Sequence, residues 1–263
     1  MIKNRVMYKY NLLLLSFILS LLSFSTTPAQ KSVYPKNSPE WLVDMFFKQI
    51  QFPEKEKYLI GEMMQDVSYP TIGEELDGRA TVTFRKIELN NQTGVYGIVI
   101  KDNGNTANFY CYVSNISGNW KIGAVRKFQL PGYIYSSADS LSQIENLPDS
   151  ISSLLRILKL LIGTDEQLKL FLSENINDFY NIVGAFDNER ADDLNFLMNK
   201  LNLEHIFTDE IYPQCIFILV GGFGRIEVGF LFSKNKSSVP KISPEQFIYL
   251  EEVLPNWYVY RAI

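Results

Sequence analysis

Acidic residues and tyrosines are the side chains of this chain that could do acid–base chemistry. Glu74, Glu75 and Asp77 precede a predicted strand, and Asp66 ends a predicted short helix. A carboxylate at the mouth of a pocket can act as a general base, and Tyr96, Tyr110 or Tyr112 could donate a hydrogen bond to a substrate. This set would suit a small-molecule isomerase, dehydratase or hydrolase. The plainer interpretation is solvated loop acids beside ordinary strand tyrosines.

Aromatic residues supply a second candidate site, an apolar ligand cavity. The aromatic candidates are Trp41, Phe46, Tyr110, Tyr112 and Trp120. Core packing is the competing interpretation, because aromatic residues at helix and strand spacing are usually buried. Asp66 and Asp77 complete the set of ligand-pocket candidates.

Metal and cofactor chemistry find little support in the residues. The single histidine, His205, excludes a metal site built on several histidines, and any catalytic triad would have to use it. The glycine-rich "GGFG" at residues 221–224 leads into a predicted strand, whereas a phosphate-binding loop leads into a helix. We therefore expect neither a metal nor a cofactor.

The two cysteines leave two alternatives open. A disulfide between Cys111 and Cys215 would close a loop of about 100 residues and could contribute up to ~4.7 kcal/mol. Each cysteine also lies within an apolar, strand-like run, "NFYCYV" and "PQCIFIL", which is typical of buried free thiols.

The first residues have the pattern of a secretory signal peptide. Lys3, Arg5 and Lys9 form a basic start, an apolar run follows at residues 12–24, and "TTPAQ" predicts cleavage after Ala29. A membrane anchor is the alternative, but the run is shorter than the ~20 residues that a spanning helix needs. The sequence therefore predicts a periplasmic or secreted protein without a stable membrane anchor.

Charge and length narrow the partners and the domain organisation. Removal of residues 1–29, which hold three basic residues and no acidic one, would change the net charge from −4 to −7. This disfavours nucleic acid, which requires a concentrated basic surface, and leaves a protein or a small apolar molecule as the expected partner. The remaining length suits two small domains, at residues 30–135 and 136–263.

The first predicted domain begins with helices and continues as a sheet. "SPEWLVDMFFKQI" has Ser38 at the cap position and Pro39 at the first helical position, and a short helix is expected at residues 54–64. Turn clusters then separate four strands, expected at residues 79–90, 95–102, 107–114 and 119–129. A change of parity predicts a bulge near Arg85 and Lys86.

The second predicted domain repeats the order of helices followed by strands. An apolar stripe predicts a helix at residues 151–162, and Thr164 with Gln167 has the spacing of a capping box. A further helix is expected in "NERADDLNFLMNKLNL", and strands in "PQCIFILV", "RIEVGFLFSK", "FIYLEEVL" and "NWYVYRAI". The expected fold class is α+β, with two units that each combine helices with an antiparallel meander.

A short echo links the ends of the two units. Asn-Trp follows a turn and opens the last strand in both "ISGNWKIGAV" and "LPNWYVYRAI". Either the chain contains an internal duplication, or Asn-Trp is simply a favourable residue pair after a hairpin turn.

The first unit resembles the nuclear-transport-factor-two-like superfamily, also called cystatin-like, in its "SPEWLVDMFFKQI" helix and its closing "GNWKIGAVRKF" strand. The resemblance implies helices cradled by a curved antiparallel sheet. The superfamily includes isomerases, dehydratases, ligand-binding modules and dimeric scaffolds, so the resemblance does not choose a function. The C-terminal "VGGFGRIEVGFLFS" region resembles uncharacterised exported bacterial proteins, which implies no activity.

Three functions follow from these observations. The favoured one is an exported, non-enzymatic binding or interaction module, whose site is the concave face of one sheet or a groove between the units. The alternative is a small-molecule enzyme that uses a buried carboxylate and a tyrosine, which requires a pocket of about 300 Å³ or more with a desolvated acid. A protein that pairs with another secreted protein would instead show an exposed apolar patch.

Overall fold

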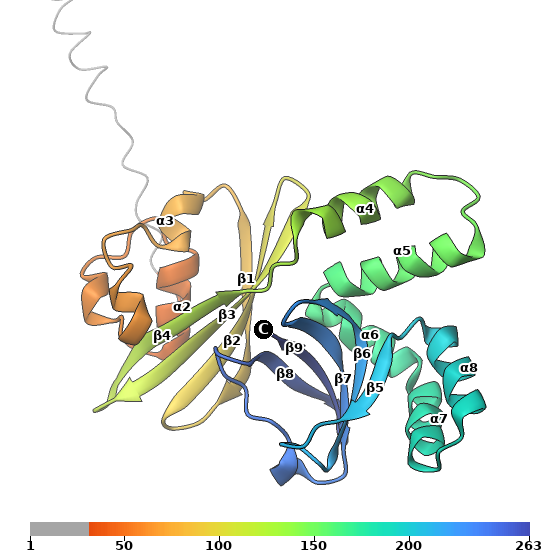
Figure 1. The fold of residues 1–263 in the computed structure, drawn as a ribbon. Coiled ribbons are helices and arrows are strands. Elements are labelled where there is room, and N and C mark those ends of the chain that lie inside the picture. The colour runs from red at the N-terminus through yellow and green to blue at the C-terminus, as the bar shows by residue number, and fades with distance from the viewer. Residues whose placement is uncertain (1–31) are drawn as a thin grey trace, which may run out of the picture.

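The computed structural model describes residues 32–263. Within them, seven α-helices and two antiparallel sheets confirm the α+β class (Figure 1). The predicted signal peptide, residues 1–29, lies outside the described residues.

The first sheet is the predicted four-stranded meander, with its strands in chain order. Its strands are β1 Thr81–Leu89, β2 Thr93–Asp102, β3 Asn105–Ile116 and β4 Asn119–Lys127. The register of β1 against β2 shifts between Lys86 and Glu88, which confirms the predicted bulge and leaves Ile87 without a partner. The bulge bends β1 at the point where it approaches the second sheet.

Helices cover one face of this sheet. α2, Pro39–Phe47, begins as predicted, because the Ser38 side chain accepts a hydrogen bond from the Trp41 N–H. The short helix expected at residues 54–64 is instead two 3₁₀ turns, Lys55–Lys57 and Gly61–Met64. Gly61 has a φ of 57°, a left-handed conformation that a continuous helix does not contain. The sequence prediction also missed α3, Ile72–Leu76, which a capping box opens.

Five helices connect the two sheets. They are α4 Gly132–Ser142, α5 Asp149–Ile162, α6 Asp165–Glu174, α7 Ile176–Asp187 and α8 Ala191–Leu201. The capping box of Thr164 and Gln167 is present at the start of α6, as predicted. The prediction missed α4, which spans the expected domain boundary between residues 135 and 136.

The second sheet departs from the predicted simple meander. Its strands are β5 His205–Thr208, β6 Cys215–Phe223, β7 Ile226–Ser233, β8 Phe247–Leu254 and β9 Trp257–Ala262. The spatial order is β5-β6-β7-β9-β8, so the last strand lies between β7 and β8. The C-terminal strand therefore occupies an internal position, and β8 becomes an edge strand.

The two Asn-Trp strands are not equivalent in this fold. Trp120 opens β4, an edge strand, and is partly buried, whereas Trp257 opens the internal strand β9 and is fully buried. Both follow a turn with a positive φ, at Gly118 and at Asn256. The different strand orders favour common hairpin chemistry over duplication as the origin of the echo.

Helices cover only one face of the second sheet. On that face Phe179 of α7 packs against Phe230 and Trp257, with ring centroids 4.8 and 5.5 Å apart. The opposite face carries a second cluster of side chains that includes Phe217, Phe247 and Tyr260. The first sheet packs against the β8 edge, near the centre of the molecule (Figure 1).

Candidate binding groove

A groove of about 940 Å³ separates the first sheet from the second. The first sheet contributes Val95, Tyr112 and Ser114 to its wall, and the second contributes Leu250 and Glu252. The opposite wall is the segment at residues 236–245, which leads into β8. Four other cavities among residues 32–263 have volumes of about 170 to 370 Å³. The groove is larger than each of them and lies at the upper end of the usual range for a ligand site.

Tyr112 and Arg126 fix one end of the groove. The Tyr112 hydroxyl donates a hydrogen bond of 2.7 Å to the backbone carbonyl of Ile248 in β8. The Arg126 Nε donates one of 2.8 Å to the carbonyl of Pro244. Because both donors lie on the first sheet and both acceptors on the second unit, these bonds hold the two walls in register.

Two of the acids in the groove are held in their ionised form. A hydrogen bond from Arg126 lowers the pKa of Glu62. A hydrogen bond from Lys236, 2.6 Å long, lowers the pKa of Glu252. Neither group is the desolvated acid, with a raised pKa, that the enzyme alternative requires.

A buried polar cluster lies on the helical side of β8. Asp165 is 6 % exposed and Arg261 is fully buried. The Asp165 Oδ1 accepts hydrogen bonds from the Tyr110 hydroxyl at 2.8 Å and from the Arg261 Nε at 2.9 Å. The Arg261 Nη2 donates to the Gly163 carbonyl at 2.6 Å, and its guanidinium lies 4.1 Å from the ring centroid of Phe128. Burial raises the pKa of Tyr110, so its hydroxyl keeps its proton.

Arg85 extends this cluster to the bulged edge strand β1. Its Nη2 lies 2.6 Å from the Glu251 Oε2 and 3.3 Å from the Tyr249 hydroxyl, both on β8. Its Nε lies 3.2 Å from Glu166 on α6. The interface cluster is therefore defined as Arg85, Tyr110, Asp165, Tyr249, Glu251 and Arg261. Its charges are paired with one another and line neither the groove nor the smaller cavities, which is typical of a structural joint.

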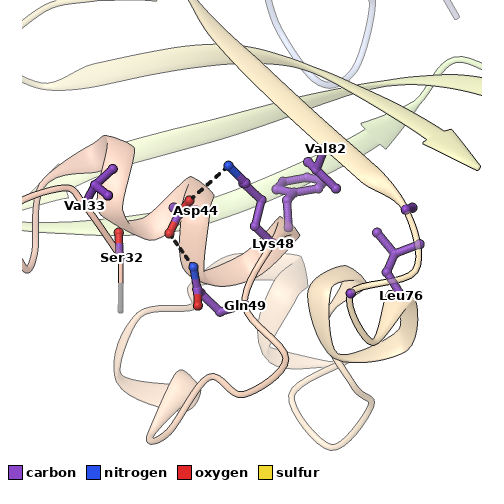
Figure 2. Close-up of a pocket in the computed structure, with 10 residues that line it drawn as sticks. Ser32, Val33, Asp44, Lys48, Gln49, Leu76 and Val82 are labelled. Atoms are coloured by element: carbon purple, nitrogen blue, oxygen red, sulfur yellow. Dashed lines mark hydrogen bonds and ion pairs between the residues drawn. The ribbon is translucent and has the colours of Figure 1, made fainter. Parts of the chain in front are cut away.

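A small cavity beside α2 contains another buried carboxylate. The cavity has a volume of about 170 Å³, and Asp44 is 3 % exposed. The Gln49 Nε2 donates to the Asp44 Oδ2 at 2.7 Å, and the Lys48 Nζ lies 3.8 Å from its Oδ1 (Figure 2). The neighbours of Asp44 satisfy its carboxylate, and the cavity is below the size of a small-molecule site. We therefore assign Asp44 a structural role near the C-terminal end of α2.

The first sheet separates the aromatic residues that the sequence suggested as one cavity lining. Trp41 and Phe46 are buried in the core cluster under α2, and Trp120 packs against the same cluster. Tyr110 and Tyr112 belong to the core on the opposite face. The reason is the alternation of side chains along β3, so of these five residues only Tyr112 lines the groove.

Neither of the two acidic candidates lines this groove. Asp77 is exposed and caps the end of α3 with a φ of 48°. Asp66 is also exposed, and together with Phe46 it lines a cavity of about 250 Å³ beside the second 3₁₀ turn. Neither acid is desolvated, and neither lies beside a candidate tyrosine.

The structure decides between the two alternatives for the cysteines. Cys111 and Cys215 are free and buried. Cys111 packs in the cluster under α2, whereas Cys215 belongs to the cluster on the far face of the second sheet. The disulfide is not formed because the two residues lie in separate cores, and burial raises the pKa of both thiols.

Sequence reasoning missed the interface cluster. A usable signal was Arg261, a lone charge in the otherwise apolar strand "WYVYRA", which predicts burial with a partner. Asp165 carried no such signal, because an acidic residue after a capping threonine is also typical of a helix start.

Comparisons with known proteins add no further assignment. A scan against protein-family models, a search of curated proteins and a search of solved structures each return no match. The resemblance of the first unit to the nuclear-transport-factor-two-like superfamily therefore stays a prediction. Among residues 32–263, no helix has the length and apolar character to cross a membrane. No group of three or more potential ligand side chains in this part of the chain could hold a metal ion.

Proposed function

We propose that this protein is an exported binding module whose ligand occupies the groove between its two sheets. The observation that carries the proposal is the groove itself, about 940 Å³ in volume and lined by both sheets and by residues 236–245. The bonds from Tyr112 and Arg126 preform its walls, and a preformed site avoids the cost of ordering on binding. Export follows from the predicted signal peptide.

The polar groups of the groove suit recognition better than acid–base catalysis. Glu62 and Glu252 are paired with basic side chains that lower their pKa. The hydroxyl of Tyr112 already donates to the Ile248 carbonyl. A catalytic pair of acid and tyrosine would need both groups directed toward a substrate, so the geometry supports binding as the first function to test.

Mass spectrometry of the mature protein, purified from its own host, tests this proposal. We expect native spectra to show added mass that disappears on denaturation. Ser114→Trp would abolish that added mass, because Ser114 shares the face of β3 that carries Tyr112 and lines the groove.

The matched control is Thr83→Trp, which places the same bulk on an exposed position of β1 outside the groove. This variant should keep the bound mass. A ligand that binds the Ser114→Trp protein as well as the wild type would contradict the proposal.

A further inference from the structure

The edges of both sheets border the groove. The first sheet ends at β1, whose Glu88 lines the groove, and the second ends at β8, whose Leu250 and Glu252 line it. The two edges meet where the Arg85 Nη2 lies 2.6 Å from the Glu251 Oε2. An edge strand has a sheet partner on one side only, so the backbone N–H and C=O groups on its other side are open to a further strand.

On the free side of β8, backbone groups at the start of the strand have hydrogen-bond partners, whereas those along its middle do not. The carbonyls of Phe247 and Ile248 accept hydrogen bonds from the Ser243 N–H and the Tyr112 hydroxyl. Among the described residues, no hydrogen bond from outside the sheet reaches the backbone of Tyr249–Leu254. Within this stretch, Leu250 and Glu252 border the groove.

The position of this edge restricts what can pair with it. Residues 236–245 form a wall on one side and the first sheet a wall on the other, so the groove admits a single extended segment more readily than the edge of another folded sheet. A bulge between Glu252 and Leu254 ends regular pairing, which limits an added strand to roughly four residues opposite Tyr249–Glu252.

The charges that line the groove indicate which extended segments it would bind. Glu88 and Glu245 line the groove and have no salt-bridge partner among the described residues, whereas Lys241 is the one lining lysine without such a partner. The whole chain is also acidic, with a net charge of −4. Basic side chains on the ligand would complement this excess of negative charge.

We propose that the ligand of the groove is an extended, basic peptide segment of a partner protein, which adds a strand to the free edge of β8. This inference rests on the proposed binding function and names its ligand class. Backbone hydrogen bonds to β8 would supply affinity, and the groove walls would select side chains.

A random-peptide display library, selected against the mature protein, tests the ligand class. We expect the enriched peptides to be rich in Lys and Arg and to lack a central proline. The best peptide is then synthesised in two forms, with backbone N-methyl groups on alternate residues in one register or in the other. Only one row of amides in a strand faces β8, so one form should lose at least about fivefold in affinity by calorimetry, while the other keeps it.

Hydrogen exchange locates the peptide. Binding should slow exchange of the amides of Tyr249–Leu254, and Ser114→Trp should remove both the binding and this protection, whereas Thr83→Trp should keep both. Enrichment of acidic peptides, no enrichment at all, equal affinity of the two methylated forms, or protection elsewhere would each overturn the inference. If these results overturn it while native mass spectra still show a bound molecule that Ser114→Trp removes, the groove binds another ligand class and the proposed function stands.

Discussion

The two faces of the first sheet are built on different principles. The face under α2 is sealed by apolar side chains, among them Leu42, Phe47 and Ile122, which are fully buried. The opposite face meets the second unit through another apolar core, to which Tyr110 and Tyr112 belong, and through the buried pair of Asp165 and Arg261. Beside this pair the sheets diverge into the groove. A single sheet thus packs against an apolar core on each side, and the side toward the second unit also contains the charged joint.

This difference teaches how the groove is held open. Apolar packing is not directional and would allow the two sheets to close on each other. Buried ion pairs and hydrogen bonds are satisfied in only one geometry, so they fix the orientation of β8 against the first sheet, although they contribute little net stability by themselves. The interface cluster and the Tyr112 and Arg126 bonds therefore set the shape of the binding site.

Arg261→Met provides the strongest test of the charged joint. Removing the guanidinium leaves the Asp165 carboxylate buried without its main partner, which should lower the free energy of unfolding by about 3–5 kcal/mol. Urea denaturation measures this loss. The control Arg225→Met removes an exposed arginine and should change stability by less than about 0.5 kcal/mol. A loss below about 1 kcal/mol for Arg261→Met would contradict the role of the pair.

Leu42→Ala tests the apolar core under α2, on the other face of the same sheet. Leu42 is fully buried in the cluster under α2, so its truncation should cost about 2–5 kcal/mol. Because the sheet separates this cluster from Arg261, the double variant should show the sum of the two losses within about 0.5 kcal/mol. A larger deviation in the denaturation curves would mean that the two faces are coupled, and the contrast between them would fail.

Two tyrosines on the same face of β3 compare charged and neutral acceptors directly. Tyr110 donates to the Asp165 carboxylate, and Tyr112 donates to the Ile248 carbonyl. Tyr110→Phe should cost about 1.5–3 kcal/mol and Tyr112→Phe about 0.5–1.5 kcal/mol, because hydrogen bonds to charged groups are stronger. The reverse order in urea denaturation would show that the charge of Asp165 adds nothing to the joint.

Local patterns predicted the first sheet well. Its turn clusters lie close in sequence, and the change of parity at Arg85 and Lys86 located the bulge to within one residue. Ser38 and Thr164 also marked helix starts that the structure confirms. These features depend on residues near each other in the chain, which is why the sequence could reveal them.

The joint and the groove depend on contacts across long sequence separations. Nothing in "FIYLEEVLPNWYVYRAI" shows that β9 passes between β7 and β8, yet this crossing places Arg261 inside the molecule and makes β8 an edge. Tyr110 lies 55 residues from Asp165 in sequence. A groove between the units was among the predicted sites, but its lining residues, apart from Tyr112, could not be named without this topology.

The smallest expected effect concerns the exposed ion pair of Glu62 and Arg126 at the groove end. A hydrogen bond from Arg126 holds the pKa of Glu62 below its ordinary value of 4.5 in the folded protein. The pair therefore stabilises the fold above pH 4.5, and this contribution is lost as the pH falls through the lowered pKa. Glu62→Gln cannot titrate, so its stability should fall less steeply than that of the wild type below pH 4.5, with a difference of at most about 1 kcal/mol for a pair so exposed. Parallel urea curves from pH 6 to pH 3 measure the slope, and Glu56→Gln, an exposed acid outside the groove, serves as the control. Identical slopes for Glu62→Gln and the wild type would show that this pair does not stabilise the groove end. The wall would then be held by the hydrogen bonds from Tyr112 to Ile248 in β8 and from Arg126 to Pro244 in the segment before it.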